Sequence, residues 1–156
     1  MTTIVTRIDK IVPLTIAEVD QNFINLNNDK LEKVGGTLTN GRLTSSRVDP
    51  RTASISSSAS ITINSDTTDI FTITALEEST TINAPTGTPV NGQKLTIRIK
   101  DNGTLRALTW TTTSGAFRQI GTFLPTATIA NKTVYIGCIY NSTDSYWDVI
   151  AVAQEL

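Results

Sequence analysis

The stretch K-L-T-I-R-I-K (Lys94–Lys100) decides the fold of this chain, because apolar and polar residues alternate through it without a break. A period of two places every second side chain on the same face of an extended strand. The apolar members of the stretch are Leu95, Ile97 and Ile99. Similar alternation recurs at Ile61 and Ile63, and at Phe71, Ile73 and Ala75. These segments predict strands that bury one face and expose the other.

Turn signals connect the predicted strands. Asp101-Asn102-Gly103 predicts a hairpin from Lys94–Lys100 into a strand over 105–111, and residues 141–145 predict a second hairpin between 134–140 and 146–153. No helical crossover of βαβ type lies between the strands, so a parallel sheet is not expected. The sequence predicts a mainly β fold with an N-terminal helix. Its C-terminal domain is expected to be an antiparallel β-sandwich, jelly-roll-like.

A helix is predicted near the N-terminus, within Pro13–Gly36. Thr15 and Glu18 have the T-x-x-E spacing of a capping box, in which each side chain accepts a hydrogen bond from a backbone N–H of the first turn. Gly35-Gly36 supplies a residue that can adopt the left-handed conformation at the helix end. These signals predict a helix that begins after Thr15 and ends before the glycine pair.

The apolar residues of this helix lie on one narrow edge, with spacings of three and four residues typical of a coiled-coil seam. After Leu26 the seam moves to a second register that also contains Asn27, a polar residue of the kind that fixes register and oligomer number. Two arrangements remain open, a parallel bundle of three identical helices or an amphipathic helix packed on its own β domain. The predicted trimer seam consists of Ile16, Val19, Phe23, Leu26, Leu31 and Val34.

Four segments follow from these patterns. The predicted organisation is an anchoring N-terminal arm (1–12), a helical stem (13–36), an extended linker (37–52) and an antiparallel β domain (53–156). The first ten residues contain no apolar stretch of signal-peptide length, so export by that route is not expected.

Composition excludes several classes of chemistry. The 156 residues include no His and one Cys, and the net charge is −1. Without His, Ser-His-Asp and Cys-His catalysis and the commonest zinc ligand are excluded. The charge gives no basic field for nucleic acid, and no segment approaches the ~18 apolar residues of a membrane span. We therefore expect no catalytic residue, metal or cofactor, no nucleic-acid partner and no membrane insertion.

Two weaker candidates remain among the acidic residues. Glu77 and Glu78 are adjacent at a strand end, where solvated turn residues are far more common than a glycosidase pair. The segment Asn64-Ser65-Asp66, together with Asp69, offers oxygen ligands for a loosely held Ca²⁺ but lacks the order of a known calcium loop.

Aromatic residues are candidates for stacking on sugar rings if they share an exposed face. On the alternation, Tyr140 falls on the face of Val134 and Ile136, and Trp147 on that of Val149, so both are expected in the core. The five aromatic candidates are Trp110, Tyr135, Tyr140, Tyr146 and Trp147.

A resemblance to a known class of proteins is carried by P-L-T-I-A-E-V-D-Q-N-F-I-N-L (Pro13–Leu26). This stretch resembles the stem-start motif of many bacteriophage tail-fibre and related virion proteins. The following D-K-L-E-K-V-G-G-T-L-T-N-G-R-L (Asp29–Leu43) is similar to the G-G-T-M-T-G-x-L linker repeat of phage fibre shafts, with Leu38 in place of Met and Asn40 inserted before Gly41.

The C-terminal part resembles a β domain found at the ends of assorted phage structural proteins, over Gly92–Trp110 and Tyr135–Glu155. The resemblance implies a homotrimer located on a virion, held to other virion proteins (tail, baseplate or capsid) by the N-terminal arm, with a host-surface glycan as a further expected partner. A tail fibre, a head fibre and a capsid decoration protein remain open, as do a free lectin-like carbohydrate-binding module and a glycan-degrading enzyme.

Overall fold

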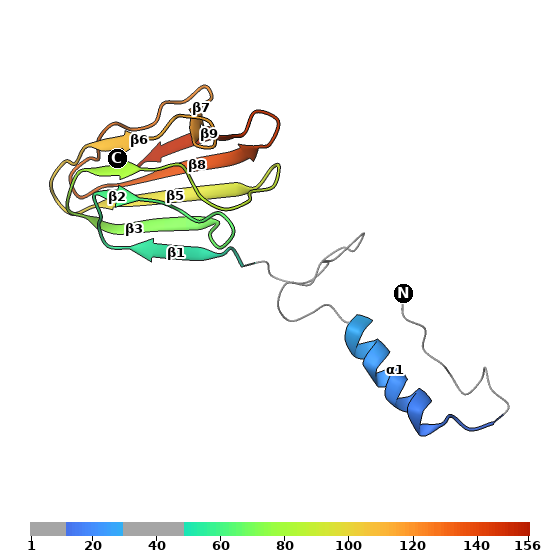
Figure 1. The fold of residues 1–156 in the computed structure, drawn as a ribbon. Coiled ribbons are helices and arrows are strands. Elements are labelled where there is room, and N and C mark those ends of the chain that lie inside the picture. Colours follow the sequence, from blue (N-terminus) through green and yellow to red (C-terminus); the bar gives the residue numbers. More distant parts are fainter. Residues whose placement is uncertain (1–11, 30–48) are drawn as a thin grey trace. The chain divides into compact units, whose positions relative to one another are not determined.

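The computed structural model describes residues 12–29 and 49–156. The chain divides into two units, residues 1–47 and residues 48–156 (Figure 1). The predicted arm, except for Val12, and most of the predicted linker lie outside the described residues.

The first unit contains helix α1, Ile16–Asp29. Its start confirms the predicted capping box: the Thr15 backbone N–H donates to Glu18 Oε2 at 2.9 Å, and the Glu18 N–H donates to Thr15 Oγ1 at 3.3 Å. The two side chains also bond each other, with 3.0 Å between Thr15 Oγ1 and Glu18 Oε2. Two backbone N–H groups of the first turn are therefore satisfied locally. The predicted helix end at Gly35-Gly36 lies outside the described residues.

The second unit consists of strands arranged in two sheets (Figure 1). The six-stranded sheet has the order β1-β3-β5-β8-β9-β7, and the three-stranded sheet has the order β2-β4-β6. The strands described are β1 (Thr52–Ile55), β2 (Ser60–Ile61), β3 (Ile70–Leu76), β4 (Thr80–Ile82), β5 (Lys94–Asp101), β6 (Leu108–Trp110), β7 (Phe117–Gln119), β8 (Thr133–Asn141) and β9 (Tyr146–Gln154).

From β1 to β6 the chain alternates between the two sheets, so that each successive pair of strands adds one strand to each sheet. β1, β3 and β5 pair in parallel, and so do β2, β4 and β6. A strand in the opposite sheet thus supplies the crossover that parallel pairing requires, a part usually played by a helix. The result is a winding of three turns, closed by the antiparallel strands β8 and β9.

This topology corrects the sequence-based prediction of an antiparallel domain. Between the named strands, antiparallel pairing is confined to β5–β8 and β8–β9, and β7 joins β9 in parallel. One isolated antiparallel bridge joins Ala107 to Ala127. The hairpin predicted at Asp101-Asn102-Gly103 is wrong, because β6 pairs with β4 in the other sheet. The hairpin predicted across residues 141–145 is confirmed as β8–β9. The domain is mostly β, as expected, but its six-stranded sheet is mixed and its three-stranded sheet is parallel.

The core lies between the two sheets and follows the predicted alternation. Leu95, Ile97 and Ile99 of β5 are fully buried, while the residues between them face outward. Residues of the three-stranded sheet, among them Ile82 and Leu108, belong to the same apolar cluster. Burial of a large apolar side chain stabilises a fold by about 1.5–3 kcal/mol, so this shared cluster holds the sheets together.

Asp101 and Cys138 are buried residues that carry ionisable groups. Asp101 continues the inward side of β5 and is 2% exposed. Burial alone would raise the pKa of its carboxyl, but hydrogen bonds from Thr128 Oγ1 (2.5 Å) and from the N–H groups of Asn131 (3.0 Å) and Gly103 (2.7 Å) lower it. Cys138 is buried, as predicted, and burial raises the pKa of its thiol to about 12.

Candidate functional site

The apolar edge of α1 is the surface that the sequence singled out, and the structure exposes it. Ile16 is 82% exposed, Phe23 is 67% exposed and Val19 is 36% exposed. Ile24, which belongs to the second register, is also exposed. We refer to Ile16, Val19 and Phe23 as the apolar edge of α1. Exposed apolar side chains at a spacing of three and four residues are available to pack against a partner helix.

The remaining seam residues are not placed by the structure. The Leu26 side chain, Leu31 and Val34 lie outside the described part of the chain. The described turns of α1 alone would bury three large side chains against a partner, at about 1.5–3 kcal/mol each.

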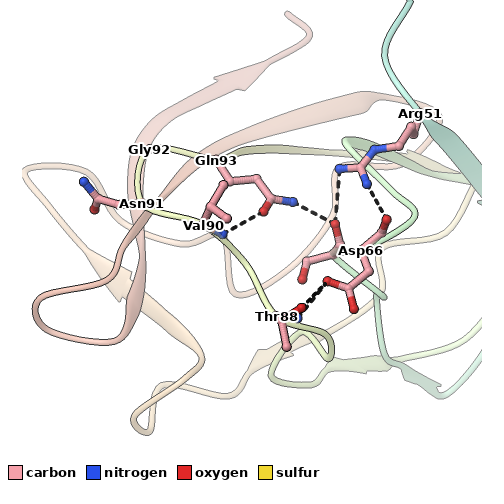
Figure 2. Close-up of a pocket in the computed structure, with 8 residues that line it drawn as sticks. Arg51, Asp66, Thr88, Val90, Asn91, Gly92 and Gln93 are labelled. Carbon is pink, nitrogen blue, oxygen red and sulfur yellow. Dashed lines mark hydrogen bonds between the residues drawn. The ribbon is translucent and has the colours of Figure 1, made fainter. Parts of the chain in front are cut away.

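An open hollow of about 450 Å³ lies at one end of the six-stranded sheet, between the start of β1 and the loop before β5 (Figure 2). Its polar groups bind mainly one another. Asp66 Oδ1 accepts hydrogen bonds from the Thr88 N–H at 2.7 Å and the Thr88 hydroxyl at 3.1 Å. Gln93 Nε2 donates to the Ser65 carbonyl at 2.7 Å. Asn91 points away from this group in Figure 2, and its Oδ1 accepts from the Ser142 N–H at 3.1 Å.

Arg51 closes the hollow on the side of β1. Its Nε and Nη2 donate to the two oxygens of Asp69 at 2.9 and 2.5 Å, and Nη1 donates to the Asp66 carbonyl. The hydrogen bonds from Arg51 lower the pKa of Asp69 and hold its carboxylate ionised. These contacts fasten the start of β1 to the loop before β3. We therefore assign the polar groups that line the hollow a structural role.

The residues considered for Ca²⁺ binding belong to the same group of contacts. Asp69 is neutralised by Arg51, and Asp66 Oδ1 is directed to Thr88. Within residues 12–29 and 49–156, no three His, Cys, Asp or Glu side chains are grouped so that they could hold a metal ion. Both Asp69 oxygens, Asp66 Oδ1 and Asn64 Oδ1 already accept hydrogen bonds, which Ca²⁺ would have to displace.

The acidic pair directly follows β3 in the sequence. Glu77 Oε1 accepts a hydrogen bond from Asn102 Nδ2 at 3.1 Å, and its backbone N–H donates to Ser57 Oγ at 3.0 Å. Glu77 and Glu78 are both exposed at the end of β3, and neither lines a described pocket. The contacts of Glu77 fasten the strand end to its neighbours.

The aromatic residues separate into inward and outward sets. Trp147 is buried and Tyr140 packs against the core, as the alternation predicted. Trp110 also packs on the core, donating from Nε1 to the Pro125 carbonyl at 2.8 Å. Tyr146 is half-buried beneath the Arg118 guanidinium, whose carbon lies 5.0 Å from the ring centroid. Tyr135 is 44% exposed on the outward face of the six-stranded sheet.

The charge networks of Arg51 and Arg118 were not predicted from the sequence. Each joins residues that are far apart in the chain, so no local pattern points to them. A membrane-crossing helix is not found either, since no described helix is long and apolar enough.

Comparison with known proteins gives no relative: the chain matches no protein-family model, no curated protein and no solved structure.

Proposed function

We propose that this chain is a structural component of a bacteriophage virion, which assembles as a short homotrimeric fibre for attachment to the host and has no catalytic activity. The observation that carries the proposal is the apolar edge of α1, where Ile16 and Phe23 are largely exposed. A narrow apolar edge, with residues spaced by three and four as in a coiled coil, is best covered by identical helices. The resemblance of Pro13–Leu26 to the stem-start motif supports the same assembly.

The described turns of α1 are too short to hold a trimer by themselves. α1 is 14 residues long, and isolated helices of about 12–15 residues are marginal in water. The β units and the N-terminal arm are therefore expected to share the trimer contacts, and the arm to bind other proteins of the particle. A location on the tail is the first expectation, with a head fibre or capsid decoration protein as the alternative.

The mass of the purified full-length chain in solution tests the assembly. Light scattering is expected to give three times the 16.8-kDa mass of the chain. Phe23→Asp places a charge on the apolar edge and is expected to lower this mass. Gln21→Asp introduces the same residue on the opposite side of α1 and should leave the trimer intact. A monomeric wild-type chain, or equal effects of the two variants, would contradict the proposal.

The location is tested separately. Electron microscopy of particles carrying a labelled copy of the chain is expected to show label at the tail. Label on the head would favour the decoration protein, and particles without label would remove the virion assignment.

A further inference from the structure

The outward face of the six-stranded sheet carries a row of residues in register across four strands. Thr72 of β3 pairs with Arg98 of β5, Arg98 pairs with Tyr135 of β8, and Tyr135 pairs with Ala153 of β9. The residues before and after Arg98 and Tyr135 on their strands are buried, so the row itself points away from the core. Register therefore brings together an arginine and a tyrosine that are distant in the sequence.

Two open hollows flank Tyr135 on this face. One, of about 190 Å³, is lined by Thr74, Arg98, Lys100, Thr133 and Tyr135. The other, of about 380 Å³, is lined by Thr133, Tyr135, Ala153, Gln154 and Glu155. Ligand pockets generally measure about 300–1,000 Å³. The hollow of about 380 Å³ lies within this range, and the smaller one of about 190 Å³ extends it on the other side of Tyr135.

Arg98 differs from the two arginines that fasten the fold. Arg51 and Arg118 each form a fork with an aspartate. Among residues 12–29 and 49–156, no carboxylate or carbonyl bonds to the Arg98 guanidinium, which is exposed. Its neighbour Lys100 donates to the Asn131 carbonyl at 2.5 Å and lies 3.8 Å from Glu155 Oε2. The five N–H donors of Arg98 are thus available in the geometry that matches a carboxylate.

We propose that this face binds an acidic saccharide, with the Arg98 fork on a sugar carboxylate and the Tyr135 ring against the apolar face of a sugar ring. The Thr72 hydroxyl, which can both donate and accept, matches the hydroxyls of such a ligand. The Thr74 hydroxyl already donates to the Ile55 carbonyl at 3.3 Å and the Thr133 hydroxyl bonds to the Glu155 carboxylate, so each of these offers an acceptor oxygen. A ring that is apolar on its face and polar at its tip suits a ligand that is itself amphipathic. This inference rests on the proposed attachment function and names the ligand class for it.

Charge argues against a second copy of the chain as the occupant. Lys94, Arg98 and Lys100 all project outward from β5, and Glu155 is the one acidic residue that lines the two hollows, so two such faces brought together would mainly place cation against cation. The central part of protein interfaces is also depleted of charged residues. Nucleic acid is not favoured as the occupant, because this face offers one exposed aromatic side chain for base stacking and the chain has a net charge of −1. A carboxylated sugar satisfies the arginine and the tyrosine together.

Calorimetric titration of the full-length chain tests the proposal. The probes are an oligogalacturonate and the same oligosaccharide with its carboxyls methyl-esterified, which keeps the rings but removes the charge. The acid form is expected to bind at least about 10-fold more tightly than the ester, because a hydrogen-bonded charge pair is lost. Arg98→Gln should weaken binding of the acid form by about 10- to 100-fold. Arg98→Lys should recover only part of this loss, because Lys lacks the fork.

Matched variants separate this site from general charge attraction. Tyr135→Leu is expected to weaken binding of both probes by roughly 3- to 10-fold. Lys94→Gln removes the same charge from the far end of β5 and should weaken the acid form less than about 3-fold. Equal effects of Lys94→Gln and Arg98→Gln, equal binding of the two probes, or no binding by the wild type would each overturn the proposal.

The competing occupants have their own readouts. An oligo-dT that binds more tightly than the oligogalacturonate would replace the saccharide with a nucleic acid. Light scattering of Arg98→Gln is expected to match the wild type, and a lower mass would instead assign this face to contacts between copies. Because binding and mass are measured separately, loss of the saccharide site and failure of the trimer proposal remain distinguishable.

Discussion

Arg118 and Asp148 are register partners on β7 and β9 and are joined by two hydrogen bonds, 2.6 Å from Nε to Oδ1 and 3.0 Å from Nη2 to Oδ2. Arg118 Nη1 also donates to Asp144 Oδ2 at 2.9 Å. β7 has three residues and lies at the edge of the sheet, so this fork adds to the backbone pairing with β9 and to the burial of Phe117 in holding the strand. Bidentate pairs are stronger and more directional than single ion pairs.

Asp148→Asn is expected to lower the midpoint of thermal unfolding by a few degrees, because an amide cannot accept both hydrogen bonds of the fork. Asp144→Asn is the matched control: Asp144 makes one bond to Arg118, and its side chain is 47% exposed. Exposed single pairs contribute little, so the control should shift the midpoint less. The same shift for both variants would show that the fork has no special role.

Stability is expected to fall in acid. Hydrogen bonds from Arg118 lower the pKa of Asp148, and those from Arg51 lower the pKa of Asp69, each from an ordinary value of 3.8. The folded chain therefore keeps these groups ionised where the unfolded chain has already bound protons. Their stabilising contribution is complete above pH 3.8 and is lost as the pH falls through the lower folded values.

The free energy of unfolding is expected to be independent of pH in the neutral range. With no His in the sequence, no side chain of ordinary pKa near 6.5 titrates. Denaturant unfolding at a series of pH values is expected to show constant stability between about pH 6 and 8 and a decline only in acid. Asp148→Asn should reduce the size of that decline, and an unchanged acid profile would contradict the assignment.

Gly87→Ala is expected to destabilise the second unit by about 1–3 kcal/mol. Gly87 has a φ of +104°, and a Cβ there would lie 2.7 Å from Ser65 Oγ and 2.8 Å from Asp66 Cγ. Gly92→Ala is the control, since its φ is +82° but no atom lies within 4 Å of an added Cβ. Urea unfolding should therefore show a smaller loss, the backbone strain alone, for Gly92→Ala.

Ile97→Ala is expected to cost about 2–5 kcal/mol, because Ile97 is fully buried between the sheets and a cavity would remain. Thr96→Ala, one residue away on the outward side of the same strand, should change stability by no more than about 0.5 kcal/mol. Comparable losses at the two positions would mean that the facing of β5 is different from that described.

Local patterns predicted a large part of the elements. The T-x-x-E spacing of Thr15 and Glu18 located the start of α1, and the alternation from Lys94 to Lys100 located both faces of β5. The hairpin β8–β9 followed from two alternating segments and a short polar turn. Such features are predictable because they depend on contacts between residues close in sequence or on the period of one strand.

The candidate surfaces could be predicted only in part. The apolar edge of α1 is a property of one helix, so its residues were identified before the structure was known. The pairing of Arg98 with Tyr135 depends on which strands are neighbours and on their register. Alternation predicts which face of the sheet each residue lies on, but it does not predict which residue of the neighbouring strand lies beside it.

The sequence by itself determined where α1 begins, which side chains of β5 and β8 face the core, and that His-dependent chemistry is excluded. Only the tertiary structure decided that β1, β3 and β5 run parallel and that β6 joins the other sheet. The physical reason is that an alternating strand buries one face equally well beside a parallel or an antiparallel neighbour. The choice is made by connections and long-range packing, which also brought Arg51 to Asp69 and Arg118 to Asp148.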